Sequence, residues 1–305
     1  VTVQFKEPRG AVGGMKIVYL GPFATFNHFT AAKTFPNEML EPKMTIPECL
    51  DAVLADEADA ALVPLENALE GSVTITVDYL VHEVDLPIQG EINTPIEQHF
   101  MVHPNNRDDW EKVETVYSHS HAIAQCHKFL HKVLKGVPVE NTNSTAAAAQ
   151  YVKDNPQLKI AAIASELAAL EYGLEIVKYH IHDYSHNTTR FIVVSKNKLD
   201  FPNIEAKENG RKTTLMIELP ENHPGTLHQV LSAFSWRRLN LSKIESRPMK
   251  TGLGNYFFLV DVEMALDDVL IPGTIQELEA LGCKVAILGS YRSFSVKGIK
   301  MSSIK

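Results

Sequence analysis

Short apolar runs alternate with amphipathic stretches from residue 15 to about residue 195, and this alternation constrains the fold more than any other feature of the sequence. Residues 17–20, 60–63 and 160–163 have the composition of short buried strands. Each run is followed by apolar residues at helical spacing, around residues 28–35, 72–80 and 165–173. Strand followed by helix, repeated along the chain, is typical of an α/β fold with a largely parallel sheet.

Helix boundaries can be predicted at several places in this region. Ser72, Ser144 and Ser165 each stand before an apolar periodic stretch and are expected to cap a helix. One continuous helix is expected over residues 123–134, with Gly136 ending it. These boundaries show where strands give way to helices.

Polar residues are concentrated at those junctions: Thr25, Glu66-Asn67, Ser118-His119-Ser120 and Ser144-Thr145. In α/β sheets, ligands bind beyond the carboxyl ends of the strands, opposite helix N-termini. Unpaired backbone N–H groups at those termini attract anions. A further cluster, Asn187-Thr188-Thr189-Arg190-Phe191, directly precedes the strand-like residues 192–194. The sequence therefore predicts a site for a small anionic ligand formed by several loops.

The chain changes character after residue 200. Residues 200–210 are polar and contain Pro202 and Gly210, so we interpret them as a linker. Strands are then expected at residues 213–219, 241–247, 256–262 and 284–290, with helices around 227–234 and 275–281. This order predicts a ferredoxin-like βαββαβ unit. The expected domains are residues 15–200 and 211–295.

Composition limits the classes of function. The net charge of −8, without a basic run, argues mildly against nucleic acid as a partner. Three widely spaced cysteines are typical of reduced cytosolic thiols. No apolar stretch is long enough to span a membrane, and residues 1–14 lack the apolar core of a signal peptide. We expect a cytoplasmic protein with a poorly ordered extension at residues 1–14 and a frayed tail at 300–305.

Five short motifs, in order across residues 15–290, resemble those of prephenate dehydratases. They are Gly21-Pro22 with Thr25-Phe26, Pro64-Leu65-Glu66-Asn67 with Glu70-Gly71-Ser72-Val73, Ser118-His119 with Ala124-Gln125-Cys126, Ser144-Thr145-Ala146, and Thr189-Arg190-Phe191. The resemblance implies a two-lobed, periplasmic-binding-protein-like catalytic domain with its cleft between the lobes. One lobe would contain residues 15–95 and the strand after Phe191, and the other the residues in between. Ala24, Ala68 and Ser120-His121 depart from the family pattern and leave the shape of the pocket open.

The resemblance also implies roles for individual residues. Thr189 would hydrogen-bond the departing oxygen, and Asn67, Ser118 and Gln125 would orient the substrate. Substrate-binding positions would be Thr25, Glu66, Ser144, Thr145, Arg190 and Phe191. Arg190 would be a carboxylate partner or a loop anchor, and Phe191 would pack behind the cleft. Glu66 would be a proton source or, as we favour, a cap of the following turn.

The C-terminal unit resembles an ACT domain of the phenylalanine-binding kind. The resemblance rests on Pro224-Gly225-Thr226-Leu227 and Glu245-Ser246-Arg247-Pro248. It implies that L-phenylalanine binds at an interface between two chains and inhibits the enzyme. A homodimer or homotetramer is therefore expected.

The implied reaction converts prephenate to phenylpyruvate with loss of carbon dioxide and water. Aromatisation drives it, so no redox cofactor or metal is demanded, and we predict none. His180-x-His182 and His119-x-His121 have metal-ligand spacing, but thirteen histidines make such spacing common by chance. Two alternatives stay open: the same chemistry on arogenate, and a non-catalytic sensor of aromatic amino acids.

Overall fold

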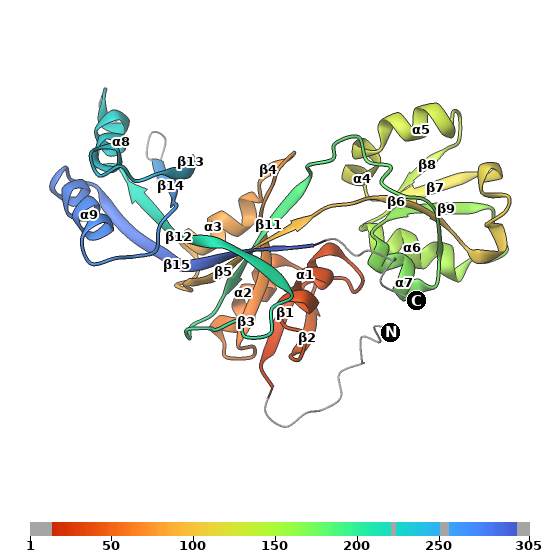
Figure 1. Cartoon of the computed structure of the whole chain (residues 1–305), viewed down its shortest axis with the longest axis horizontal. Coiled ribbons are helices and arrows are strands. Elements are labelled where there is room, and N and C mark those ends of the chain that lie inside the picture. Colours follow the sequence, from red (N-terminus) through yellow and green to blue (C-terminus); the bar gives the residue numbers. More distant parts are fainter. Residues whose placement is uncertain (1–13, 221–223, 251–255, 298–305) are drawn as a thin grey trace.

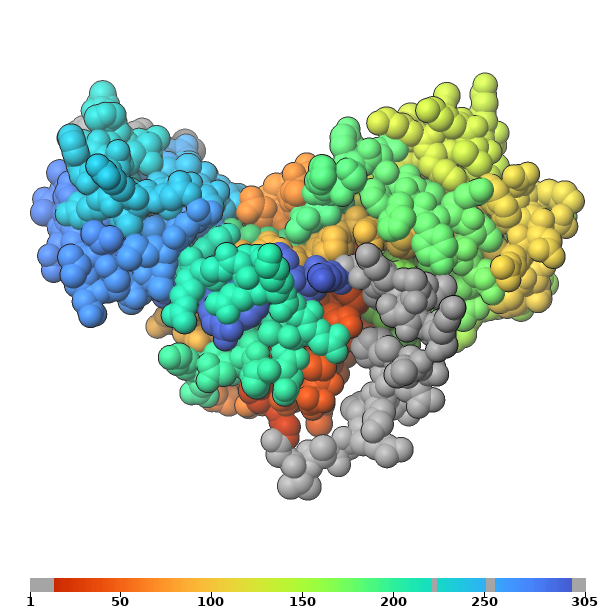
Figure 2. Space-filling model, in the orientation of Figure 1, coloured from red at the N-terminus to blue at the C-terminus, as the bar shows by residue number. Residues whose placement is uncertain are grey.

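The computed structural model describes residues 14–220, 224–250 and 256–297. Three units lie in a row: a central lobe, a second lobe on one side, and the C-terminal unit on the other (Figure 1). In the space-filling view, the second lobe and the C-terminal unit rise on either side of the central lobe (Figure 2). Within the described ranges, no helix is both long and apolar enough to cross a bilayer.

The central lobe is built on strands from both ends of the predicted catalytic region. Its strands are β1 (Lys16–Leu20), β2 (Met39–Lys43), β3 (Ala60–Asn67), β4 (Gly71–Ser72), β5 (Ile88–Pro95) and β11 (Thr188–Val194), and its helices are α1 (Phe26–Thr34), α2 (Ile46–Leu54) and α3 (Thr74–His82). Residues of α1 pack with Ile17 and Phe191 on one face of the sheet. Residues of α2 and α3 pack with Val18 and Ile192 on the other. Alternate side chains of each strand thus enter two separate cores.

The second lobe has its own five-stranded sheet, in the order β10-β6-β9-β7-β8. Its strands are β6 (His99–Val102), β7 (Thr115–Ser118), β8 (Val139–Asn141), β9 (Ile160–Ala164) and β10 (Glu175–Lys178), and its helices are α4 (Ser120–Gln125), α5 (His127–Val133), α6 (Thr145–Asp154) and α7 (Glu166–Tyr172), with short 3-10 turns η1 (Pro104–Asn106) and η2 (Trp110–Lys112).

Two segments connect the lobes, one leaving the central lobe after β5 and one returning before β11. They lie side by side, because Ile96 N donates to Asn187 O at 2.9 Å and Ile181 N donates to Gln98 O at 3.0 Å. After the return, β11 lies between β3 and β5 and is antiparallel to both. The expectation that the strand after Phe191 belongs to the first lobe is confirmed.

The C-terminal unit extends the central sheet. It contains β12 (Ala206–Glu218), α8 (Thr226–Trp236), β13 (Leu241–Pro248), β14 (Tyr256–Val262), α9 (Leu270–Ala280) and β15 (Lys284–Val296). The order of elements is the predicted βαββαβ. β15 pairs in parallel with β5, from Arg292 opposite Gly90 to Ser295 opposite Asn93. One ten-stranded sheet therefore runs through both units.

Several local expectations need correction. About half of the expected linker, residues 200–210, is a strand, because residues 206–210 belong to β12 and pair with β15. The expected helix over residues 123–134 is two helices, interrupted at Cys126. The sheets are mixed, because β5, β6, β10 and β11 run antiparallel to neighbours. The expectations for residues 1–13 and for the tail at 300–305 concern residues outside the described ranges.

Two of the three predicted serine caps are confirmed, and the third is wrong. Ser144 and Ser165 cap α6 and α7 as expected, accepting from Ala147 N at 3.0 Å and Ala168 N at 3.2 Å. Ser72 is no cap: α3 begins after Val73 without a side-chain cap. The Ser72 hydroxyl instead donates to Glu245 of the C-terminal unit.

Candidate active site between the lobes

The Asn67 amide and the Thr189 hydroxyl form the centre of the site. The two residues are paired partners on β3 and β11. Asn67 Nδ2 donates to Thr189 Oγ1 at 2.9 Å and to Asn187 Oδ1 at 2.9 Å. Thr94, which pairs with Thr189 on β5, shares a hydrogen bond of 2.9 Å with Thr30 of α1. The middle of helix α1 is therefore close to this end of the strands.

The other contacts of Asn67 fix the orientation of its amide. Asn67 Oδ1 accepts from Leu69 N at 2.9 Å and from Glu70 N at 3.2 Å. The opposite end, Nδ2, must then be the one that faces Thr189. Because Thr189 Oγ1 accepts this bond, its own proton is directed to another acceptor. The hydroxyl is thus arranged as a donor.

Asn67 lies at the end of a tight turn. Asn67 pairs with Gly71 and Glu66 with Ser72 in a short antiparallel ladder. Gly71 has a φ of 83°, a conformation that side chains disfavour. The turn brings Glu70 toward the second lobe while holding the Asn67 amide beside β11.

The second lobe reaches the cluster of Asn67, Asn187 and Thr189 through Gln125. Gln125 Oε1 accepts from Asn187 Nδ2 at 3.0 Å, and Gln125 Nε2 donates to Glu70 Oε1 at 3.0 Å. His121 Nδ1 lies 2.5 Å from the other oxygen of Glu70. A chain of polar contacts therefore joins Thr189 to the second lobe.

Ser118 has a different environment from the other three predicted catalytic residues. It is fully buried at the end of β7, and its Oγ donates to Ile163 O at 2.6 Å. The hydroxyl thereby links β7 to β9. Its place at the end of a strand next to α4 is the one expected from the sequence.

The polar residues predicted at the starts of helices cap or begin those helices. Thr25 Oγ1 donates to Pro22 O at 2.9 Å and accepts from His28 N at 3.4 Å, so it caps α1. Ser144 caps α6, and Thr145 is the first residue of that helix. Ser144 and Thr145 are half-buried, and Thr25 is buried.

Arg190 points to the face of the sheet opposite Thr189. Its Nε donates to Glu91 Oε2 and its Nη1 to Asp261 Oδ2, both at 2.5 Å. Its Nη2 donates to Tyr291 OH at 3.0 Å. Burial alone would raise the pKa of Glu91, but the charges of Arg190 and Lys212 lower it to about 2. Of the two roles expected for Arg190, these contacts are those of an anchor.

Glu66 and Phe191 are also directed away from the cluster. Glu66 Oε1 lies 2.8 Å from Lys243 Nζ, and Glu66 Oε2 lies 3.5 Å from Arg190 Nη1. Glu66 therefore makes ion pairs, a role that the sequence did not indicate. Phe191 is 2% exposed and packs in the core with Tyr19 and Ile92.

The predicted phenylalanine-binding positions lie at the start of α8 and on β13. Gly225 has a φ of 91° and precedes α8, which begins at Thr226; Pro224 and Leu227 are exposed. On β13, Ser246 and Pro248 are exposed, whereas Glu245 and Arg247 face the central lobe.

The inward-facing pair on β13 contacts the central lobe of its own chain. Glu245 accepts from Ser72 Oγ, and Arg247 Nη2 donates to Asp78 Oδ1 of α3 at 2.7 Å. These two side chains are therefore part of the contact between the units.

Three residues that contact this cluster were given no role in the site from the sequence: Asn187, Glu70 and His121. Asn187 lies two residues before Thr189, so in an extended segment both side chains point to one face. Glu70 belongs to the same motif as Asn67. Those two spacings are signals that the sequence offered. The approach of His121 depends on how the lobes are placed, and we find no local signal for it.

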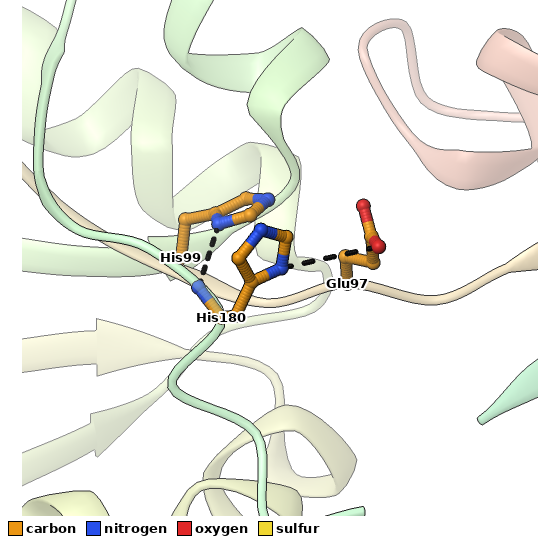
Figure 3. A group of neighbouring side chains, drawn as sticks. All are labelled: Glu97, His99 and His180. Atoms are coloured by element: carbon orange, nitrogen blue, oxygen red, sulfur yellow. Dashed lines mark hydrogen bonds and ion pairs between the residues drawn. The ribbon is translucent and has the colours of Figure 1, made fainter. Parts of the chain in front are cut away.

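Among the described residues, Glu97, His99 and His180 form a group that could hold a metal (Figure 3). Their ligand atoms lie within 4.8 Å of one another. Burial, and then the charges of His180 and His182, lowers the pKa of His99 to about 3, so this ring is neutral.

The contacts within this group are those of a structural link. His99 Nδ1 accepts from His180 N at 3.1 Å, and His180 Nδ1 lies 3.9 Å from Glu97 Oε1. Ligands of one tetrahedral zinc ion lie about 3.4 Å apart. A metal would require these donors to move closer, whereas the present hydrogen bond joins β6 to the returning segment (Figure 3).

The sequence matches a family model described as prephenate dehydratase over residues 17–199. The chain belongs to the prephenate dehydratase family. A second family model, the ACT domain, matches residues 213–281. The chain is 56% identical over 285 residues to the prephenate dehydratase of Bacillus subtilis, a match that covers 92% of this chain and 100% of the relative.

Solved structures share the fold of this chain over most of its length. The prephenate dehydratase of Arthrobacter aurescens, solved in complex with L-Phe, matches with a TM-score of 0.79 and 33% identity over 90% of this chain and 89% of its own. A chain described as a novel type of quorum-quenching acylase matches with a TM-score of 0.78 and 26% identity, covering 91% of this chain and 98% of its own. The predicted fold class, two-lobed catalytic domain plus ACT domain, is confirmed.

Proposed function

We propose that this protein is a prephenate dehydratase that converts prephenate to phenylpyruvate in phenylalanine biosynthesis. The observation that carries the proposal is the hydrogen bond from Asn67 Nδ2 to Thr189 Oγ1, because it leaves the hydroxyl proton as a donor. The identity of 56% with a prephenate dehydratase supports the substrate class. Since an acylase-described chain shares the fold, the fold alone would not support an activity.

The proposed chemistry follows from the donors of this cluster. The bond between the ring and its carboxylate breaks, and its electron pair enters the ring and expels the hydroxyl group. The Thr189 hydroxyl donates a hydrogen bond to the departing oxygen in the transition state, and a proton from solvent completes water. Carbon dioxide and phenylpyruvate are the other products.

A threonine hydroxyl is too weak an acid to release its proton near neutral pH, so it acts by stabilising the developing charge. The bond it accepts from Asn67 polarises its O–H group and strengthens that donation. Gln125 brings a donor and an acceptor from the second lobe. Lobe closure around a dianion would exclude water, which favours loss of the carboxylate.

The test is a spectrophotometric assay for phenylpyruvate from prephenate, run in parallel with arogenate. Turnover of prephenate supports the proposal. Faster turnover of arogenate would make the protein an arogenate dehydratase. No turnover of either substrate by a folded chain that binds phenylalanine would favour the non-catalytic sensor.

We further propose that L-phenylalanine binds the ACT unit at residues 211–295 and inhibits the catalytic unit at 15–200. The binding positions would be Pro224, Gly225, Thr226, Leu227, Glu245, Ser246, Arg247 and Pro248. The relative from A. aurescens was solved with L-Phe, which supports this ligand class. Calorimetry of the full chain with phenylalanine, and with tyrosine for comparison, tests it.

A cytoplasmic homodimer or homotetramer is part of the same proposal. Exposed apolar side chains on the ACT unit support an assembly through this unit. Leu227, Leu231 and Trp236 of α8 and Ile244 of β13 are between 37% and 79% exposed. Light scattering across a concentration series measures the oligomeric state, and a monomer throughout would contradict the proposal.

A further inference from the structure

Consecutive residues of two paired strands face opposite sides of the sheet at the active site. Thr189 pairs with Asn67, and the next residue, Arg190, pairs with Glu66. Because side chains alternate along a strand, the first pair faces the active site and the second faces away from it. The second pair is in contact with the ACT unit.

The contact to Glu66 comes from β13. Lys243 Nζ lies 2.8 Å from Glu66 Oε1 and donates to Ser72 Oγ at 2.8 Å. Glu66 and Ser72 flank the turn that holds the Asn67 amide. The Lys243 side chain is only 10% exposed. Screening by solvent is therefore weaker than for a surface pair.

The contact to Arg190 comes from β14 and β15. Asp261 accepts from Arg190 Nη1, and its other oxygen accepts from Thr214 Oγ1 at 2.6 Å. Tyr291 OH accepts from Arg190 Nη2. Asp261 is fully buried, and Tyr291 is 4% exposed. The guanidinium thus has partners from the ACT unit on two sides.

We propose that Lys243 and Asp261 are positioning residues for the reaction, although both belong to the ACT unit and neither faces the active site. By holding Glu66 and Arg190, they fix the backbone of the adjacent pair, Asn67 and Thr189. Misplacement of a catalytic group by about 1 Å can lower the rate by about a hundredfold. Loss of either contact therefore lowers kcat more than it raises KM.

The contact between Lys243 and Glu66 has a further consequence. Lys243 lies two residues before Glu245, where the β13 segment proposed to bind phenylalanine begins. A ligand that shifts β13 moves the ammonium that holds the Asn67 turn. The inference rests on the proposed function, since its test needs a turnover rate.

The test compares Lys243→Met, Lys243→Arg and Asp261→Asn with the wild-type chain in the prephenate assay. Lys243→Met keeps the volume of the side chain and removes its charge. Lys284→Met is the matched control, because Lys284 is an exposed lysine of the ACT unit paired with Glu218 at 3.0 Å. Circular dichroism and the thermal midpoint are measured for every variant.

For Lys243→Met we expect kcat to fall about tenfold or more, with KM changed less than threefold and the fold retained. Lys243→Arg should recover most of the rate, and Lys284→Met should match wild type. Asp261→Asn should lower kcat in the same direction. If it fails to fold, Tyr291→Phe replaces it, because it removes one partner of Arg190 and keeps the ring.

Unchanged kcat in folded Lys243→Met and in folded Asp261→Asn or Tyr291→Phe would overturn the inference while wild-type turnover still supports the proposed function. A loss of rate that also appears in Lys284→Met, or that Lys243→Arg does not recover, would overturn it too. A wild-type chain without turnover would instead refute the proposed function.

Discussion

The Asn67 amide donates to the Thr189 hydroxyl from an adjacent, paired strand, at 2.9 Å. This relationship defines which group in the site accepts and which donates. Two residues that are far apart in sequence thus form one unit, with the amide supporting the hydroxyl.

Thr189→Ala should lower turnover by about a hundredfold or more, because one transition-state donor contributes on the order of 3 kcal/mol. Thr188→Ala should be much milder, since its side chain points to the other face of the strand. Steady-state kinetics on prephenate compares them. Equal losses would show that the wrong hydroxyl has been chosen.

Asn67→Asp tests the direction of the hydrogen bond. The carboxylate can still accept from Leu69 N and Glu70 N, but it has no donor for Thr189 and adds a negative charge near a dianion. We expect kcat/KM to fall at least a hundredfold with little change in thermal midpoint. A variant with near wild-type kinetics would contradict the assigned orientation of the amide.

Gln125→Ala removes the two contacts that join the second lobe to Asn187 and Glu70. Since two hydrogen bonds contribute about 1–3 kcal/mol, KM should rise roughly tenfold or more as the closed arrangement is lost. Gln150→Ala, on the exposed side of α6, serves as the control. The prediction fails if both variants behave alike.

How far the sequence predicts this site depends on whether the relevant interactions are local. Ser144 and Ser165 were predicted as caps because a cap bonds only three residues ahead. Ser72 has the same local pattern, yet its partner is Glu245, 173 residues away. Arg190 is the same case, because Asp261 is distant in sequence. The motifs therefore predicted where the strands end. The partners of Ser72 and Arg190 on the opposite face of the sheet could be identified only from the tertiary structure.

The interruption at Cys126 has a similar cause. The spacing of the apolar residues predicted one helix, and the apolar face continues from α4 through Cys126 into α5. The break brings Gln125 O toward Asp183 N, which donates to it at 2.6 Å, and Asp183 accepts from Lys128 N. A contact with the returning segment thus overrides a regular pattern of side chains.

His99 should make stability depend on pH. Its pKa is lowered to about 3 in the folded state, against about 6.5 when unfolded. The unfolded chain therefore binds a proton that the folded chain does not, and stability falls as pH drops from 6.5 toward 3. This residue should contribute on the order of 1 kcal/mol per pH unit over that window.

His99→Asn should reduce that slope, because the amide oxygen can still accept from His180 N and the side chain does not titrate. Denaturant unfolding at pH 7, 6, 5 and 4 measures it. His127→Asn, at an exposed position on α5, should keep the wild-type slope. Parallel curves for wild type and His99→Asn would refute the prediction.

The parallel pairing of β15 with β5 bears on how this protein can be divided. Truncation after residue 205 would leave β5 as a bare edge, with unpaired N–H and C=O groups open to other chains. A truncated catalytic half should therefore aggregate. The ACT unit thus also covers an edge of the central sheet, and a variant that lacks it should lose solubility together with the proposed regulation.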